Sequence, residues 1–224
     1  MNKTTQIIKL PKFSKELAEE TGIHIGDGSM NLYRSGNKNH WGYVYSSHLV
    51  DDKEYRDYVK NLMKLLYNLY PYEKTKNNCT CLVYTKKDLI LFKQKVGLPM
   101  GKKTEIIIPD WIMKDSIYAK NCVRGIVDTD GCIRFRKPFK GTKRSYPNIK
   151  ICNVSEPLIK QLEQIFKDFG LKPSIYHEIR DVGNTLHVLN LNGLDNLNKY
   201  LTNFGFSNNK HIKKYLFWKE NGYY

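Results

Sequence analysis

The sequence predicts an α+β protein made of two αββαββα repeats in a single chain. Three observations support this class. The segment ETGIHIGDG around Asp27 returns as VRGIVDTDG around Asp130, 103 residues later. Each Asp-Gly pair is followed, in the same order, by two strand-like segments, an amphipathic helix, a hairpin and a second helix. Each copy then closes on a glycine, Gly97 or Gly205, where a helix C-cap is expected.

The first repeat is predicted within residues 1–105. Its first helix begins after Ser14, which can serve as N-cap, and ends at Asp27. The following elements are strands at 29–35 and 41–48, a helix at 52–70, a hairpin at 72–85 and a helix at 87–96. The long helix is predicted from apolar side chains at helical spacing, namely Tyr55, Val59, Leu62, Leu66 and Leu69.

The second repeat is predicted within residues 106–224. The joint GLPMGKKTEIIIPDW contains Gly and Pro and cannot form one helix, and Asp110 is expected to cap a helix that runs through Val127. The following elements are strands at 132–137 and 146–153, a helix at 156–169, a hairpin at 174–191 and a helix at 194–204.

The composition favours a nucleic-acid partner. There are 37 Lys and Arg residues against 22 Asp and Glu, a formal net charge of +15, which indicates a polyanionic ligand. The alternative is charge that serves solubility alone. No apolar run is long enough for a membrane helix, the five cysteines form no CxxC pair typical of zinc sites, and MNKTTQIIKLPKF lacks a secretory h-region. We expect an intracellular protein, in the cytoplasm or an organelle matrix and not secreted.

The repeated Asp-Gly indicates chemistry beyond a turn. Asp-Gly after a helix is also an ordinary way to turn into a strand. However, a negative Asp at a helix C-terminus interacts unfavourably with the macrodipole, at a cost of roughly 0.3–1 kcal/mol in stability. Small residues such as Gly22 and Gly125 allow two helices to approach closely. That packing would bring Asp27 and Asp130 together, where divalent metal neutralises them and promotes phosphodiester hydrolysis.

The strands predict an outward face suited to DNA. Side chains alternate along a strand, and the outward sets are polar, aromatic or cationic. These candidate DNA-binding residues are Asn31, Tyr33, Ser35, Lys74, Lys76, Arg134, Arg136, Asn148 and Lys150. Their inward neighbours include Met30, Leu32, Ile133 and Phe135. Such side chains suit base edges and phosphates in the major groove, although a merely solvated sheet face would look similar.

The two motifs resemble the signature helices of single-chain LAGLIDADG homing endonucleases. The second copy is closer, with Gly125, Asp128, Asp130 and Gly131 in place, whereas the first carries Glu20, His24 and Ile25 where the pattern differs. The resemblance spans about residues 12–219. It implies that the two signature helices pack at the centre and that two antiparallel sheets form a DNA-binding saddle.

The resemblance also implies site residues. Asp27 and Asp130 would share the metal, Mg²⁺ with Mn²⁺ as a possible substitute, helped by backbone carbonyls of Gly26 and Thr129. A basic residue near each centre would be Lys102 or Lys103 in one repeat and Lys210 in the other. Phosphate contact without catalysis is an equal alternative for each lysine. His48 and Asn153 would order the water network, although His48 as an ordinary hairpin-end residue is nearly as consistent.

The predicted function is therefore a monomeric, intron-encoded double-strand DNA endonuclease with a long, nearly non-palindromic target. The family resemblance implies cutting across the minor groove to leave short 3′ overhangs. An RNA maturase that binds intron RNA, a catalytically inactive DNA-binding protein and an intein endonuclease domain are the alternatives. Both acids are retained, which favours the nuclease, and the termini lack protein-splicing residues.

Overall fold

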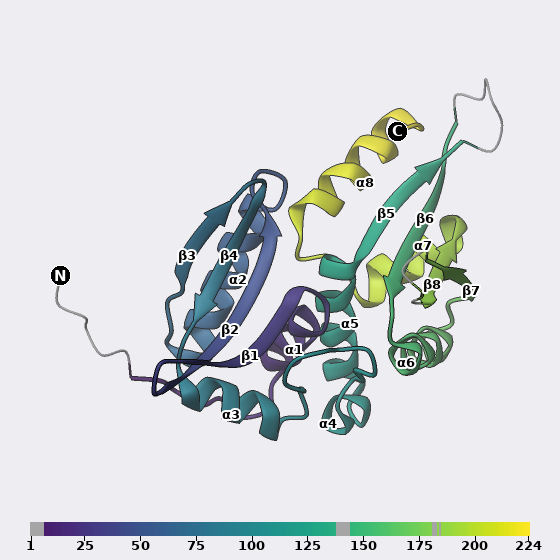
Figure 1. Ribbon diagram of the computed structural model, residues 1–224. Coiled ribbons are helices and arrows are strands. Elements are labelled where there is room, and N and C mark those ends of the chain that lie inside the picture. The colour runs from purple at the N-terminus through teal and green to yellow at the C-terminus, as the bar shows by residue number, and fades with distance from the viewer. Residues whose placement is uncertain (1–6, 138–143, 181–182, 184) are drawn as a thin grey trace.

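Two four-stranded antiparallel sheets stand side by side, with helices between and behind them (Figure 1). The computed structural model describes residues 7–137, 144–180, 183 and 185–224, with Ser35 and Lys38 described in their backbone alone. Both sheets have the same strand order, β1-β2-β4-β3 and β5-β6-β8-β7. The predicted α+β class with two equivalent repeats is confirmed.

The first repeat has the predicted elements. In chain order they are α1 (Lys15–Asp27), β1 (Gly28–Ser35), β2 (Lys38–His48), α2 (Lys53–Tyr67), β3 (Tyr72–Lys76), β4 (Cys79–Tyr84) and α3 (Lys87–Lys95). Ser14 caps α1, because its hydroxyl accepts the N–H of Leu17 at 3.2 Å. The helix α2 ends three residues before the predicted position, because Asn68 adopts the left-handed conformation at φ 53°.

The second repeat follows the same order with two additions. Its elements are α4 (Asp110–Met113), α5 (Ser116–Asp130), β5 (Gly131–Arg136), β6 (Tyr146–Asn153), α6 (Glu156–Asp168), β7 (Pro173–Ile179), β8 (Thr185–Asn192), α7 (Gly193–Asn203) and α8 (Asn209–Asn221). The boundary predicted near residue 105 lies between α3 and α4 and stays a prediction.

The single helix predicted from Asp110 to Val127 is wrong. The segment contains two helices, because the Asp115 carboxylate accepts the N–H groups of Ile117 and Tyr118 at 2.8 and 3.1 Å and so starts α5 anew. The Asp110 side chain makes no cap; Pro109 occupies the N-cap position of α4.

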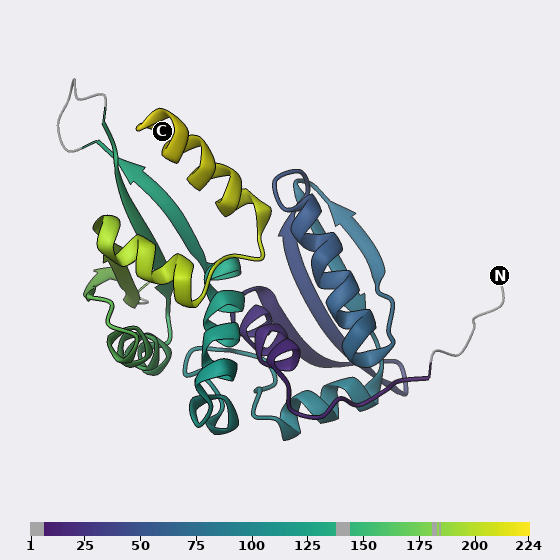
Figure 2. The ribbon, with the colours of Figure 1, turned by 180° about the vertical axis from the view of Figure 1, so that it is seen from behind.

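The helix α8 is absent from the sequence prediction. Asn208 begins it by accepting the N–H of Lys210 at 3.1 Å, and Gly222 ends it at φ 73°. Its Trp218 stacks on Phe135 of β5 with ring centroids 5.0 Å apart. Seen from behind in Figure 2, α8 lies across the space between the two halves, next to the inward face of β5 and the start of α2.

The core lies between each sheet and its helices, with α1 and α5 side by side at the centre (Figure 2). Met30, Ile133 and Ile149 are fully buried, as their inward positions predict. Leu32 differs: it is 47% exposed, so the expectation that it faces the core is wrong, and it pairs with Trp41 near the turn that closes the β1–β2 hairpin. In the described part of the chain, no helix combines the length and apolar character needed to cross a bilayer.

Candidate active site

The two central helices touch backbone to backbone. A methyl group placed on Gly22 would lie 2.0 Å from the carbonyl oxygen of Cys122, and one on Gly125 would lie 2.3 Å from that of Glu19. One on Gly26 would meet the Thr129 hydroxyl at 2.0 Å. No side chain fits at these positions without moving a helix, so the glycines fix the distance between α1 and α5.

This contact places Asp27 and Asp130 at adjacent helix ends. Each is the last residue of its helix, α1 or α5. The pKa of Asp27 is raised to about 7, mainly by burial and further by the negative charges of Asp130 and Asp52. The positive charges of Lys103 and Lys210 lower it in part. Burial also raises the pKa of Asp130, whereas Asn153 and Lys103 act in the opposite direction. The two acids thus form a site that a cation would stabilise.

Lys103 supplies a positive charge at the end of α1. Its Nζ donates to the carbonyl oxygens of His24, Ile25 and Gly26 at 3.1, 2.8 and 2.5 Å. Burial lowers the pKa of Lys103, while the nearby Asp130 and Asp27 act against that shift. Lys102 is exposed on the surface. Of the two lysines that the sequence left open, Lys103 is therefore the one beside the acids.

Asn153 orients the second acid. Its Nδ2 donates to Asp130 Oδ2 at 2.8 Å, and its Oδ1 accepts the N–H of Ser155 at 2.8 Å. The amide is therefore held at both ends. This agrees with the position that the resemblance implied for Asn153, at the end of β6.

His48, the expected counterpart of Asn153, does not mirror it. Its Nδ1 accepts the N–H of Asp51 at 3.2 Å and lies 3.3 Å from the Asp51 carboxylate. Asp51 lies three residues after the end of β2, and these two contacts hold the His48 ring toward it. Among the described residues, no side chain or N–H donates a hydrogen bond to the Asp27 carboxylate.

Asp52 is a site residue that the sequence did not reveal. Its Oδ1 accepts from Lys210 Nζ at 2.6 Å, and its Oδ2 accepts the N–H of His48 at 3.1 Å. Burial raises the pKa of Asp52, but the Lys210 bond and charge outweigh it and hold the pKa below its ordinary value. Lys210 is thus tied to α2. A visible signal was available, since Asp52 precedes the second helix of its repeat as Ser155 does in the other.

The donor set fits a hard divalent cation. Carboxylate and carbonyl oxygens are ligands that Mg²⁺ and Ca²⁺ prefer, and no donor within the described ranges occupies the Asp27 carboxylate. Gly26 O already accepts from Lys103, so that lysine would have to shift for the carbonyl to bind metal. In the part of the chain that is described, no cluster of three or more His, Cys, Asp or Glu residues is preassembled for a metal. The two acids with helix-end carbonyls are the candidate ligands.

The outward faces carry most of the predicted DNA-binding residues. Strand register puts Asn31, Tyr33, Lys74 and Lys76 on one face of the first sheet, all exposed. Arg134 and Arg136 are exposed on the corresponding face of the second sheet. Ser35 ends β1, and its side chain lies outside the described residues.

Two predicted reading residues on β6 are held by neighbours. Asn148 is 2% exposed and donates to Asn190 Oδ1 at 3.2 Å and Asn192 Oδ1 at 2.8 Å, so the expectation of an accessible Asn148 is wrong. The adjacent strand β8 covers it because three amides pair with one another. Lys150 lies 3.6 Å from Glu178 and 5.8 Å from the centroid of the Tyr176 ring, which leaves it partly covered.

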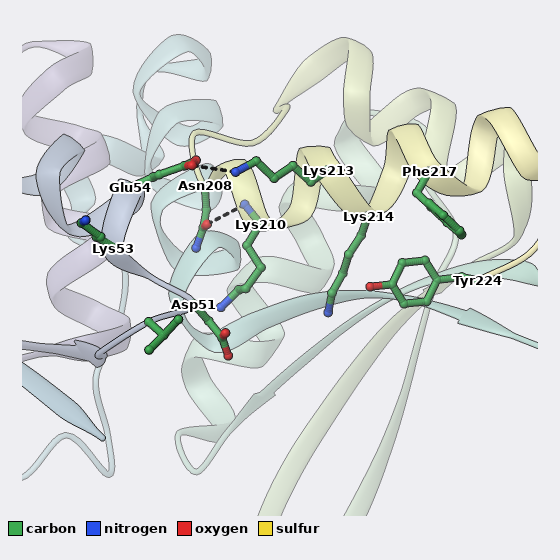
Figure 3. A pocket seen from close by; sticks show the side chains of 10 residues that line it. Asp51, Lys53, Glu54, Asn208, Lys210, Lys213, Lys214, Phe217 and Tyr224 are labelled. Atoms are coloured by element: carbon green, nitrogen blue, oxygen red, sulfur yellow. Dashed lines mark hydrogen bonds and ion pairs between the residues drawn. The ribbon is translucent and has the colours of Figure 1, made fainter. Parts of the chain in front are cut away.

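A basic cavity lies beside Lys210, between the start of α2 and α8. It has a volume of about 740 Å³, and Lys53, Lys213, Lys214 and Tyr224 line it together with Lys210. Figure 3 shows Lys210 and Lys214 extending from α8 into this space, while Lys213 turns to Glu54 of α2. Because Lys210 lines the cavity, the cavity borders the part of the candidate site that contains Lys210.

Comparison with known families and structures supports the fold assignment. A family model of the LAGLIDADG-like domain matches residues 118–205. The crystal structure of the homing endonuclease I-DmoI in complex with DNA and Mn has 16% identity and a TM-score of 0.61, and covers 86% of this chain and 97% of that chain. I-SmaMI bound to uncleaved DNA target in the presence of calcium ions has 12% identity and a TM-score of 0.63, with coverage of 93% and 90%.

Two curated proteins contain a similar segment. The tRNA-splicing ligase RtcB of Pyrococcus abyssi (strain GE5 / Orsay) is 28% identical over 140 residues, 58% of this chain. The Replication factor C small subunit of Methanocaldococcus jannaschii is 26% identical over 208 residues, 91% of this chain. This chain covers only 15% and 10% of those proteins, so the similarity concerns one segment of each.

Proposed function

We propose that this chain, which contains a LAGLIDADG-like domain and has the fold of the single-chain homing endonucleases, is a site-specific double-strand DNA endonuclease. One observation carries the proposal: each repeat delivers one half-buried acid to the contact of α1 and α5, and a lysine lies beside the pair. Metal-assisted phosphodiester hydrolysis uses such an arrangement of metal ligands next to a positive charge.

The side chains divide the work as follows. A divalent cation, when bound, activates water and stabilises the leaving oxygen. Asp27 and Asp130 would hold it, with the carbonyls of Thr129 and, once Lys103 shifts, Gly26 as further ligands, and Mg²⁺ is the expected ion with Mn²⁺ as a substitute. Asn153 keeps Asp130 turned toward the site. Lys103 stabilises negative charge that develops on the phosphate.

The two sheets would bind the DNA on either side of the acids. The first outward face offers Asn31, Tyr33 and two lysines, whereas the second offers Arg134 and Arg136 beside an amide cluster. Different side chains on the two faces favour different half-sites, so the target should be long and nearly non-palindromic. Since one chain supplies both acids, we propose that it acts as a monomer inside the cell.

The test is cleavage of a DNA library of candidate intron-insertion sites in Mg²⁺, with Mn²⁺ and Ca²⁺ in parallel. The unmodified chain should cut both strands at one site. Asp27→Asn and Asp130→Asn should each lower the rate by more than about 100-fold and bind the same DNA. Asp195→Asn, which changes an exposed acid of α7 that pairs with Lys199, is the matched control and should cut normally.

The other outcomes separate the alternatives. Efficient cutting by either acid variant would contradict the metal assignment. Tight DNA binding without cutting in any metal would indicate an inactive DNA-binding protein. Binding to structured intron RNA in the absence of DNA binding would indicate a maturase.

A further inference from the structure

The residues that begin α2 and α6 are equivalent but behave differently. Ser155 precedes α6 and caps it, accepting the N–H of Leu158 at 3.3 Å. Asp52 precedes α2 in the other repeat, 103 residues earlier, and makes no cap bond. Its carboxylate points instead at α8 and accepts from Lys210 at 2.6 Å. The acid at this position therefore binds a lysine and does not cap its helix.

The two lysines consequently sit in different environments. Lys103 reaches backbone carbonyls at the end of α1. At the end of α5, the carbonyl of Asp128 accepts from Asn208 Nδ2 at 3.1 Å, while Lys210 is held by the Asp52 carboxylate. One lysine is thus positioned by main chain and the other by a side chain. The two halves of the site are chemically unequal.

The Asp52 contact is placed to act on Lys210. The side chains of Asp52 and Lys210 are 14% and 33% exposed, so water screens the pair only partly. A lysine loses rotamer entropy when it is fixed, and a short charge-assisted hydrogen bond offsets that cost. Asn208, two residues before Lys210, donates to the Asp128 carbonyl in the last turn of α5 at 3.1 Å, so the anchored ammonium lies at the helix end that carries Asp130.

We propose that Asp52 is a positioning residue that fixes Lys210 at the end of α5, next to the acid pair, so that cutting of one DNA strand depends on Asp52 and cutting of the other does not. This inference rests on the proposed endonuclease function. The strand served by Lys103 has no such requirement, because backbone carbonyls hold that lysine.

A neighbouring ion pair provides the control. Glu54, in the first turn of α2, accepts from Lys213 of α8 at 2.6 Å (Figure 3). It also accepts from Asn209 of α8 at 2.9 Å. It ties the same two helices together without contacting Asp27, Asp52 or Lys210. If the Asp52–Lys210 pair served only to join α2 to α8, loss of the Glu54 contacts would have a comparable effect.

The experiment measures single-turnover cutting of each strand on an end-labelled duplex in Mg²⁺. Asp52→Ser introduces the residue found at the equivalent position, which can cap α2 and so preserve the helix. It should slow one strand by about tenfold or more and change the other by less than about twofold. Lys210→Met should slow the same strand, and the double variant should be no slower than Lys210→Met alone.

Two further variants test whether the Asp52 carboxylate positions Lys210 or only joins α2 to α8. Asp52→Glu should restore most of the lost rate, because it returns a carboxylate to Lys210. Glu54→Gln should leave both strand rates unchanged. Equal slowing of both strands by Asp52→Ser, unchanged rates, additive effects in the double variant, or a similar loss in Glu54→Gln would each overturn the proposal. If the unmodified chain cuts neither strand, the endonuclease function itself fails, which is a distinguishable result.

Discussion

Because of Asp128, the free energy of unfolding of the protein should fall as the pH rises. The residue is 2% exposed in α5. Its Oδ2 accepts the N–H of Ser207 at 2.8 Å, but its Oδ1 is buried and has no partner among the described residues. Burial raises the pKa of Asp128 to about 8, although its bonds to Ser207 and Asn208 act against the shift. The folded protein therefore prefers this carboxyl in its neutral form.

The size and sign of the effect follow from linkage. The unfolded chain loses this proton near the ordinary value of 3.8, whereas the folded chain keeps it to about pH 8. Between those values the folded state binds more protons, so the free energy of unfolding decreases as pH increases. Each pKa unit of this shift corresponds to about 1.4 kcal/mol, so the free energy of unfolding can decrease by at most about 6 kcal/mol. Relaxation and water penetration reduce it, and we expect at least about 2 kcal/mol.

The perturbation is Asp128→Asn, which keeps the shape and an acceptor for Ser207 but cannot ionise. Its buried NH₂ adds a pH-independent cost of about 1–3 kcal/mol. Urea unfolding of both proteins from pH 5 to pH 9 should show the variant gaining stability relative to the unmodified chain by at least about 2 kcal/mol. A difference that stays constant over this range, or moves the opposite way, would refute the reasoning.

Three further predictions concern the central helices and the site. Lys93 is fully buried against Glu20 and lies 4.2 Å from the centroid of the Tyr43 ring; Lys93→Met should cost about 3–5 kcal/mol of unfolding free energy because Glu20 is left charged and unpaired. Lys93→Met with Glu20→Gln should cost less, because the amide is neutral and still accepts from the Tyr67 hydroxyl, and chemical denaturation measures both. Gly22→Ala should destabilise by more than about 2 kcal/mol because its methyl would meet the Cys122 carbonyl at 2.0 Å; thermal unfolding should show a smaller loss for Gly42→Ala, whose methyl meets nothing closer than 4.0 Å. Because the pKa of Asp27 is raised to about 7, Mg²⁺ must displace a proton below that pH, so its affinity should fall as pH drops from 8 to 6; calorimetry in two buffers should detect proton release, and Asp27→Asn should abolish it.

The regular elements were predictable because local periodicity determines them. The segment 146–153 was predicted as a strand and is one, since its alternating Ile149 and Ile151 need a buried face. The break between α4 and α5 was missed because Asp110 and Asp115 are both good N-cap residues, and sequence alone does not show which one binds N–H groups. The helix α8 was missed because most of its surface is polar or exposed, which leaves little apolar periodicity.

The acid pair was predictable in a different way, through the repeat. Two Asp-Gly motifs in register, preceded by small residues, were enough to predict converging helix ends. The unequal partners of those acids were not predictable. Whether Lys210 binds a carbonyl or Asp52, and whether Asn148 faces solvent or two other amides, depends on side chains brought together from distant elements. Composition and spacing carry no information on such choices.

The contact between α1 and α5 also determines when, during synthesis, the first repeat can complete its packing. The glycine face of α1 has its partner in α5, and Gly125 lies 103 residues after Gly22. At roughly 5–20 residues per second, a ribosome needs roughly 5–20 s to travel between them. During that interval α1 exists without the surface that it is shaped to meet. The first repeat therefore reaches its final packing only after the opening helix of the second has been synthesised.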